Sequence, residues 1–313
     1  MVSITCVNDM DNDLKIVKKI KSAVKSLKFK LDYRDIEVIS EDRGNELIGE
    51  MLYDSTPFMV ARGGATEMRC IAQYLDNKEK TNFSEKIKKE ITELSGVFPN
   101  DDLTMKRFCE LYIEEISQAD LISLWGVGAE SVVVHEYCVN SRFTKLHALE
   151  PYYFSKPWSR MLKEKKVLVV HPFVESIISQ YKEHEKIYDN KLILPEFKSL
   201  SVVKAVQSIA GQKTSFNTWF EALENMKEQI AKCDFEVAII GAGAYGLPLA
   251  AYCKSIGKQA IQMSGATQIL FGIKGKRWDN HPVISQFYNE HWIRPSENEV
   301  PTNKDKVEGG SYW

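Results

Sequence analysis

The segment from Phe235 to Trp278 constrains the fold of this chain more than any other stretch. An apolar run from Val237 to Ile240 predicts a buried strand, which leads into a glycine-rich turn. An apolar helix is predicted from about Tyr245 to Ser255, and a second strand from Gln259 to Met263. A strand–turn–helix–strand unit of this kind is typical of α/β proteins.

Strands and helices are predicted to alternate along most of the remaining chain. Further strands are predicted at Pro57–Ala61, Asp120–Trp125, Lys145–Leu149, Lys166–Val170 and Leu200–Val206. Further helices are predicted at residues 11–30 and at Glu67–Leu75, Ser84–Leu94, Leu103–Ser117, Ser159–Lys163, Val174–Tyr188 and Asn217–Ala231. This alternation predicts an α/β fold, with a Rossmann-like, mostly parallel sheet and helices on both of its faces.

Three portions are expected to make one compact unit. Residues 1–156 form an N-terminal α/β portion, and residues 157–280 form a Rossmann-like portion that binds a nucleotide. Residues 281–313 form an irregular tail, because they contain three prolines and many aromatic residues but little periodicity. The tail is expected to wrap the surface or to edge a cleft.

Composition excludes several classes of protein. The net charge of −2 over 313 residues lacks the basic excess of a nucleic-acid binder. No apolar run approaches the roughly 18 residues that span a bilayer, and the N-terminal residues do not resemble a secretory signal. Six scattered cysteines without a C-x-x-C pair indicate reduced thiols in a cytoplasmic protein.

The glycine-rich turn matches the pattern G-x-G-x-x-G at Gly241, Gly243 and Gly246, with Tyr245 inside it. Such a turn exposes backbone N–H groups at a helix N-terminus, where phosphate binds. A nicotinamide site also needs an acidic residue at the end of the next strand, and that place is held by Gln262 and its neighbours. The alternatives are therefore a nucleotide or sugar-phosphate site, a nicotinamide site, or glycines that only permit close packing.

A second turn follows the second strand of this unit. Gly265 and Thr267 start a short apolar helix and could expose further N–H groups. Lys274, Lys276 and Arg277 come just after it, within reach of a diphosphate. Three cations in four residues can also be plainly solvated.

A third turn, Arg62-Gly63-Gly64-Ala65-Thr66-Glu67, follows the strand that ends at Ala61. Glu67 could hold a divalent metal or act as a general base. It could also be an ordinary residue of a first helical turn, favoured there by the helix dipole and capped by Thr66.

His171 follows the predicted strand Lys166–Val170, at the edge where open α/β sheets bind ligands. Glu175 lies four residues further on. The two could carry out acid–base chemistry, or His171 could be a structural histidine.

With these turns identified, the chain resembles bacterial glycosyltransferases of the GT-D fold type, through uncharacterised relatives found among surface-polysaccharide genes. The resemblance covers most of the chain and is clearest from Glu150 to Trp313. It is carried by the segments LEPYYF, PWSRMLKEKKVLVVHPF, WFEALENM, GAGAYGLPLAA to GIKGKRW, and KVEGGSYW. In enzymes of this type a strand ends in R-x-G-D-G-E, and here Arg62, Gly64 and Glu67 keep that pattern while Ala65 replaces the aspartate.

The resemblance implies transfer of a sugar from a nucleotide-sugar donor to a glycan or lipid-linked glycan acceptor in surface polysaccharide synthesis. It implies a cytoplasmic protein, peripheral at the inner face of the membrane, that can form a homo-oligomer. Mn²⁺ or Mg²⁺ would bind at Glu67; because Ala65 removes a ligand, the cations at Lys274 to Arg277 could act without a metal. Glu67 is the first choice for the base and His171 the second. The alternatives are a nucleotide-dependent oxidoreductase and a non-catalytic nucleotide-binding protein of a polysaccharide assembly complex.

Overall fold

The computed structural model describes residues 23–76 and 82–313. The described residues from 39 onward form one compact unit, and residues 23–38 belong to a separate one. Residues 23–32 are helical, so the described end of the helix predicted at 11–30 is confirmed, while residues 11–22 lie outside the described part. Among the described residues, no helix has the length and apolar character that a membrane span requires.

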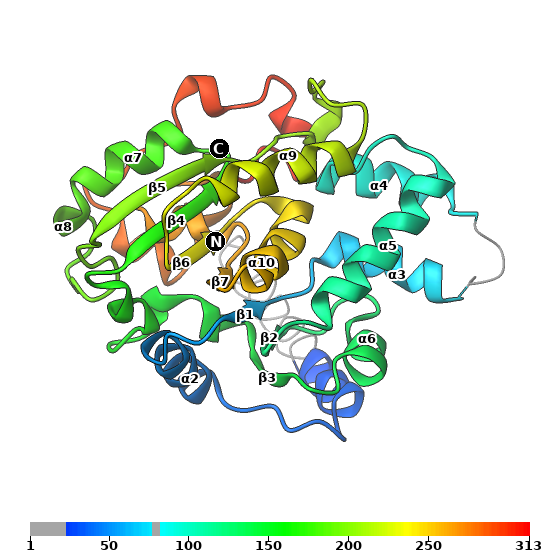
Figure 1. Cartoon of the computed structure of the whole chain (residues 1–313), viewed down its shortest axis with the longest axis horizontal. Coiled ribbons are helices and arrows are strands. Elements are labelled where there is room, and N and C mark those ends of the chain that lie inside the picture. Colours follow the sequence, from blue (N-terminus) through cyan, green and yellow to red (C-terminus); the bar gives the residue numbers. More distant parts are fainter. Residues whose placement is uncertain (1–22, 77–81) are drawn as a thin grey trace, which may run out of the picture. The chain divides into compact units, whose positions relative to one another are not determined.

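Seven strands form a single sheet in the order β3-β2-β1-β7-β6-β4-β5 (Figure 1). The strands are β1 (Phe58–Ala61), β2 (Leu121–Leu124), β3 (Arg142–Lys145), β4 (Lys166–His171), β5 (Ser199–Lys204), β6 (Val237–Ile240) and β7 (Gln259–Gln262). Every neighbouring pair is parallel. The predicted α/β class with a parallel sheet is therefore confirmed.

Helices precede, connect and follow these strands. They are α2 (Glu41–Tyr53), α3 (Ala65–Asp76), α4 (Glu85–Ser95), α5 (Asp102–Ile116), α6 (Glu130–Tyr137), α7 (Val174–Lys182), α8 (His184–Ile187), α9 (Trp219–Ala231), α10 (Gly246–Ser255) and α11 (Ala266–Leu270). Short 3-10 turns supplement them, including η1 (Leu146–Leu149), η2 (Pro151–Tyr153), η3 (Trp158–Leu162), η5 (Gly243–Tyr245) and η6 (Lys276–Trp278).

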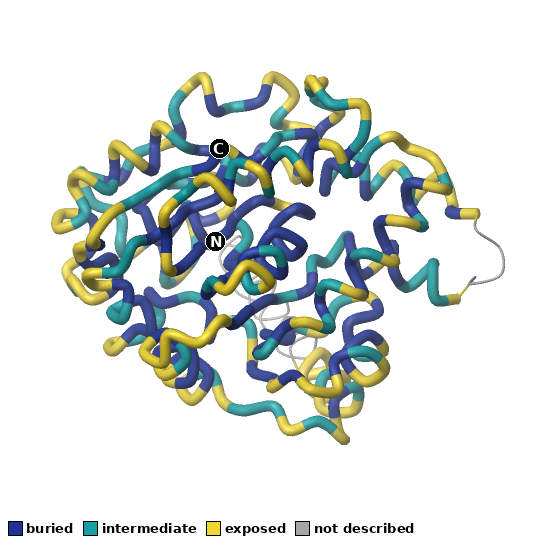
Figure 2. Tube along the Cα trace, viewed as in Figure 1, coloured by how far each residue is buried: buried dark blue, intermediate teal, exposed yellow. Residues whose placement is uncertain are grey.

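Both faces of the sheet are covered, and its central strands are buried throughout (Figure 2). One face packs against α2 and α7, because apolar residues of both helices join alternate residues of β4, β6 and β7 in one core cluster. Helix α10 contributes nothing to that cluster and packs instead against β1, β6 and β7 together with α5 and α9. Strands buried on both faces must be apolar at every position, which explains the continuous apolar run of β6.

The chain reverses its direction of travel across the sheet between β4 and β6. Strand β4 continues through α7 to β5 on one side, and β6 continues through α10 to β7 on the other. Right-handed crossovers in opposite directions place α7 and α10 on opposite faces. The carboxyl ends of β4 and β6 therefore border a crevice, the usual ligand site of such sheets.

Three predicted elements differ from the structure. Residues 146–149 form the 3-10 turn η1, and the strand is the preceding β3, where only Phe143 and Thr144 are buried and the periodic signal is correspondingly weak. The predicted helix Val174–Tyr188 is interrupted at Glu183. Thr66 is not a cap, because α3 already begins at Ala65.

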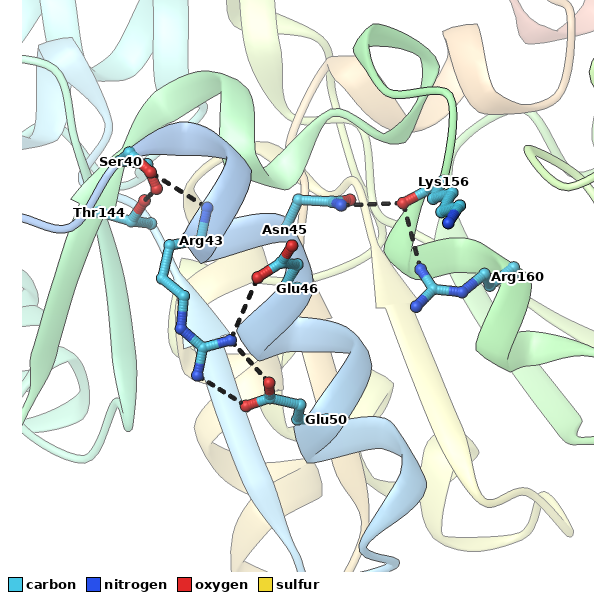
Figure 3. Close-up of polar contacts among 8 residues, drawn as sticks. All are labelled: Ser40, Arg43, Asn45, Glu46, Glu50, Thr144, Lys156 and Arg160. Carbon is cyan, nitrogen blue, oxygen red and sulfur yellow. Dashed lines mark hydrogen bonds and ion pairs between the residues drawn. The ribbon is translucent and has the colours of Figure 1, made fainter.

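Helix α2 is tied to the segment that precedes η3 (Figure 3). The Ser40 hydroxyl caps its N-terminus by accepting a hydrogen bond from the Arg43 N–H at 3.2 Å. The buried Asn45 side chain donates to the Lys156 carbonyl at 2.9 Å and accepts from the Trp158 N–H at 2.7 Å. One amide side chain thus joins residues more than 110 positions apart.

The tail is also bonded into the body of the fold. The buried Glu299 carboxylate accepts hydrogen bonds from the Glu175 N–H at 2.6 Å and from the Ser176 hydroxyl, at the N-terminus of α7. A carboxylate in that position satisfies free N–H groups and complements the helix dipole. The five cysteines within the described residues are free thiols, as predicted, and Cys6 lies outside those residues.

Candidate functional site

A cleft with two adjoining lobes lies at the carboxyl ends of the central strands. The apolar lobe has a volume of about 110 Å³ and the polar lobe about 140 Å³. Both are lined by Leu94, Ser95, Gly243, Ser264, Val307 and Tyr312. These shared walls place the two lobes side by side, and residues of the tail line both, as expected of a tail that edges a cleft.

The apolar lobe occupies the crevice between β4 and β6. Its walls are His171 at the end of β4, Phe173 just after that strand, the glycine-rich turn after β6, and Trp313 from the tail. Tyr245 forms a further wall, held by stacking on Trp219 at 4.7 Å between ring centroids and by a 3.1 Å hydrogen bond to Ser208. A largely apolar pocket with an aromatic wall at this position suits a nucleobase.

The three glycines of the turn have different roles. A Cβ on Gly241 would lie 2.6 Å from the Thr267 hydroxyl and 2.7 Å from the His171 ring, so this glycine permits close packing. Gly243 has a φ of +54° and no atoms around its missing side chain, and it lines both lobes. Gly246 begins α10 against Gln262. Only Gly243 combines a left-handed backbone with contact to both lobes among the three.

His171 is buried and neutral. Its Nδ1 accepts a hydrogen bond from the Phe173 N–H at 3.0 Å, which places the ring proton on Nε2. Burial lowers the pKa of His171 to about 3, so the ring binds a proton weakly near neutral pH. Glu175 does not share this site, because its carboxylate accepts from Asn298 instead.

The polar lobe is built on the turn between β1 and α3. The Arg62 N–H donates to Gln262 Oε1 at 2.9 Å, and the Gly64 N–H donates to the buried Tyr112 hydroxyl at 3.0 Å. The Trp125 indole donates to the Gly63 carbonyl at 2.8 Å. These three bonds from distant segments fix the turn, and Gln262 bonds the turn where a nicotinamide site would need a carboxylate.

Glu67 lies in the first turn of α3 and lines the polar lobe with only 7% of its surface exposed. A Cβ on Gly64 would collide with its carboxylate, so Gly64 makes room for this side chain. Within the part of the chain that the structure describes, no hydrogen bond or ion pair reaches that carboxylate. Buried carboxylates are normally paired, so an unpaired one in a cleft is a group available to a ligand.

Two guanidinium groups line the same lobe. Arg62 lies 5.2 Å from the centroid of the Trp125 ring. Arg277 lies 5.1 Å from the Tyr312 ring, donates to its hydroxyl at 2.9 Å and approaches Glu308 at 3.6 Å. Aromatic contacts hold both groups in place while leaving N–H donors for an anion.

Of the other residues predicted to bind phosphate, some line the cleft and some do not. Lys274 lies 5.1 Å from the Tyr288 ring centroid, and Lys276 donates to the Gly309 carbonyl at 3.1 Å; neither lines a lobe. Gly265 lines the apolar lobe against Tyr312, whereas Thr267 lies beneath the turn against Gly241. Of the three clustered cations, only Arg277 faces the described cleft.

Residue type alone does not predict that four of the residues lining the polar lobe belong to the site: Tyr112, Trp125, Gln262 and Tyr312. Tyr312 belongs to the final KVEGGSYW segment of the family resemblance, which could have indicated it. Tyr112 and Gln262 bond backbone groups about 50 and 200 residues away. No local pattern marks contacts of that range.

The donor set of the polar lobe does not fit a divalent metal. Ala65 provides no ligand beside Glu67, and no group of three acidic, histidine or cysteine side chains with ligand geometry occurs in the described ranges. Divalent cations in proteins prefer several oxygen ligands, and here the two carboxylates, Glu67 and Glu308, share the lobe with two guanidinium groups, one of which lies 3.6 Å from Glu308. The lobe therefore offers arginine donors for an anion rather than a set of oxygen ligands for a metal.

Three solved structures are similar in fold to this chain, each at 12% sequence identity. A selenomethionine-substituted domain of unknown function 1792 covers 76% of this chain and 82% of its own length, with a TM-score of 0.46. A protein described as a new glycosyltransferase from Streptococcus sanguinis covers 84% and 96%, with a TM-score of 0.41. A third, described as having a distinct glycosyltransferase fold, covers 90% and 99%, also with a TM-score of 0.41.

No family model matches the chain, and no curated protein matches it either. At 12% identity and with TM-scores below 0.5, the function has to be judged by the site itself.

Proposed function

We propose that this protein is a glycosyltransferase that moves a sugar from a nucleotide-sugar donor to a hydroxyl of a glycan acceptor. The observation that supports this most directly is the polar lobe, where Arg62, Arg277 and the unpaired Glu67 face one cavity. That cavity opens into an apolar lobe at the β4–β6 crevice. A nucleobase and a diphosphate, joined through ribose, need two such neighbouring environments.

The two guanidinium groups would stabilise the leaving nucleoside diphosphate. Transfer breaks the bond between the anomeric carbon and the diphosphate oxygen, and the electron pair stays on that oxygen. Arginine can donate two parallel hydrogen bonds to a phosphate, and the positive charge counts for more in a partly dry cleft. Arg277 and Arg62 come from opposite ends of the chain, so the folded sheet is needed to assemble the pair.

Glu67 is the proposed base for the acceptor hydroxyl. Its carboxylate lines the polar lobe without a partner within the described ranges, so it can accept the proton as the hydroxyl oxygen attacks the anomeric carbon. His171, the second choice from the sequence, is a poor base because burial lowers its pKa to about 3. Its proposed part is to wall the apolar lobe and to present Nε2–H to the ligand.

The proposed acceptor is a glycan or lipid-linked glycan of surface polysaccharide synthesis, at the inner face of the membrane. This part of the proposal rests on the sequence resemblance alone. The donor set of the polar lobe favours transfer without a divalent metal.

A thermal-shift screen of the purified full-length chain against nucleotide-sugars, with and without Mn²⁺ or Mg²⁺, tests the donor site. A donor at about 100 times its Kd should stabilise the protein by about 2.7 kcal/mol, with or without metal. Arg277→Gln removes charge-assisted hydrogen bonds to the diphosphate and should weaken binding about tenfold or more.

Lys276→Gln is the matched control, because Lys276 is the adjacent cation and does not line the lobe. It should change donor affinity far less than Arg277→Gln. Glu67→Gln should keep donor binding and lose transfer. Equal effects of the two cation variants, or full transfer by Glu67→Gln, would contradict the proposed site.

A further inference from the structure

The helix over residues 23–32 carries a row of exposed aliphatic side chains. Val24, Leu27 and Leu31 are 61%, 61% and 60% exposed, so each keeps most of its surface in solvent. Their spacing of three and then four residues places them within about 60° of one another around the helix axis. These three side chains, here called the aliphatic stripe, form one continuous apolar face that is open to a partner.

A different side of this helix makes the contacts within its own unit. Phe29 lies opposite the aliphatic stripe, and its ring centroid is 4.5 Å from that of Tyr33, which is buried. Phe29 itself is half-buried. The helix therefore packs through its aromatic side, and the aliphatic stripe is not its packing face.

Lysines border the aliphatic stripe on both edges. Lys28 lies about 40° beyond Val24 around the axis, and Lys30 lies about 60° beyond Leu27 on the other edge. These two side chains and Lys25 are exposed, and no ion pair neutralises any of the three within the part of the chain that the structure describes. Unpaired positive charge thus surrounds an open apolar face.

The same pattern extends through the sequence before this helix. Residues 14–31 contain seven lysines and no acidic residue, although the net charge of the whole chain is −2. Ile16, Val17 and Ile20 continue the apolar spacing of the stripe in the sequence, and their structure lies outside the described residues. Positive charge is therefore concentrated in one short segment of a chain that is otherwise acidic.

The surface of an anionic membrane matches both features of this helix. An interfacial helix inserts its apolar face at the boundary between headgroups and acyl chains, while lysines on its edges reach the lipid phosphates. A second copy of the helix fits less well, because in either orientation the lysines beside the two stripes would face each other. A nucleic acid would pair with the lysines but would leave the aliphatic stripe in water.

We propose that this helix binds the surface of a membrane that contains anionic phospholipids. The aliphatic stripe inserts between the headgroups, and the lysines on its edges contact the lipid phosphates. This surface is separate from the cleft, so the inference goes beyond the proposed sugar transfer and does not depend on it. Binding of this kind would bring the cleft to an acceptor that is linked to a lipid.

Co-sedimentation of the full-length chain with vesicles tests the proposal. The chain should bind vesicles of equimolar phosphatidylcholine and phosphatidylglycerol, and bind vesicles of phosphatidylcholine alone much more weakly. Binding should weaken between about 0.1 M and about 1 M salt, because salt screens the attraction of the lysines to the surface. Loss of the apolar contact in a Val24→Ser and Leu27→Ser double variant should weaken binding at least about tenfold.

Removal of the charge tests the second feature. Lys25→Gln, Lys28→Gln and Lys30→Gln should each weaken binding to the anionic vesicles about fivefold, and together about a hundredfold.

Matched controls remove the same groups elsewhere. Val139→Ser removes an exposed aliphatic side chain that follows α6. A triple variant with Lys86→Gln, Lys89→Gln and Lys232→Gln removes three exposed lysines on and beside α4 and α9. Both controls should bind vesicles as the wild type does. All variants should keep the wild-type urea midpoint and donor binding, because the substituted side chains are exposed and none lines the cleft.

The results that overturn the inference are distinct from those that overturn the proposed function. If the wild type does not bind anionic vesicles, or if the control variants lose binding as the helix variants do, this helix is not a membrane-binding surface. A dimer in sedimentation velocity that the Val24→Ser and Leu27→Ser variant abolishes, without vesicle binding, would assign the aliphatic stripe to a second copy instead. Failure to bind any nucleotide-sugar overturns the proposed function alone.

Discussion

At the scale of single residues, environment rather than residue type decides the chemistry of this cleft. His171 lines the apolar lobe and Glu67 lines the polar lobe, and both side chains are buried. The Nδ1 atom of His171 accepts a hydrogen bond from the Phe173 N–H, whereas no hydrogen bond or ion pair reaches the Glu67 carboxylate among the described residues. The Glu67 carboxylate is thus open to a ligand, whereas only the Nε2–H of the His171 ring remains available.

The lowered pKa of His171 predicts how stability depends on pH. The folded-state pKa of about 3 lies below the ordinary value of 6.5, so the unfolded chain binds the extra proton between these values. The contribution of His171 to stability is present above pH 6.5 and is lost as the pH falls toward 3, by at most about 1.4 kcal/mol per pH unit. His171→Gln should flatten the slope of unfolding free energy against pH, as measured by urea denaturation at pH 7, 6 and 5.

His135→Gln is the matched control, because His135 is exposed on α6. It should leave the slope unchanged. The same slope in wild type and in His171→Gln would show that His171 is protonated in the folded protein.

At the scale of elements, short polar links position helices whose apolar faces alone would leave them free to slide. Helix α2 packs one side on the sheet and is aligned by Asn45, which bonds both the Lys156 carbonyl and the Trp158 N–H. The Arg43–Glu50 pair on the same helix is exposed (Figure 3). The buried link should matter for stability far more than the exposed one.

Asn45→Ala tests this difference. It leaves the buried Trp158 N–H without a partner, while the Lys156 carbonyl keeps its bond from Arg160 at 3.1 Å. One orphaned buried donor should lower the free energy of unfolding by about 1–3 kcal/mol, measured by urea denaturation. Arg43→Ala should have a much smaller effect. If both substitutions have equal effects, the Asn45 link does not hold the helix.

At the scale of the whole molecule, one sheet combines strands from both predicted portions of the chain. Strand β1 lies between β2 and β7, and β7 follows β1 by about 200 residues. Arg62 and Arg277, which face one lobe, are separated by a similar stretch of chain. The site therefore exists only when the sheet is complete.

This arrangement predicts that fragments 1–156 and 157–313 will not fold alone. Each would expose an apolar strand edge, β1 in one and β7 in the other, together with the uncovered faces beside it. Circular dichroism and urea denaturation of each fragment should show no cooperative transition, while a mixture should regain part of the native signal. A cooperative transition in either fragment would mean that it forms a domain by itself.

The α/β class and most element positions could be predicted from local patterns. Buried parallel strands such as Val237–Ile240 require consecutive apolar residues, and the left-handed turn at Gly243 requires glycine. Both requirements act within a few residues. The cleft at the carboxyl edge of the sheet follows from the order of the elements, and its glycine-rich turn was predicted for the same reason.

The sequence by itself thus determined the kind of sheet and the turns at its ligand-binding edge. Only the tertiary structure decided which charges face the cleft: Arg277 lines it, whereas Lys276 bonds the Gly309 carbonyl. Gln262 bonds the Arg62 N–H from 200 positions away. The sequence alone cannot distinguish adjacent cations, because packing decides which partner each one contacts. The pKa values of the site also depend on burial, which no local pattern specifies.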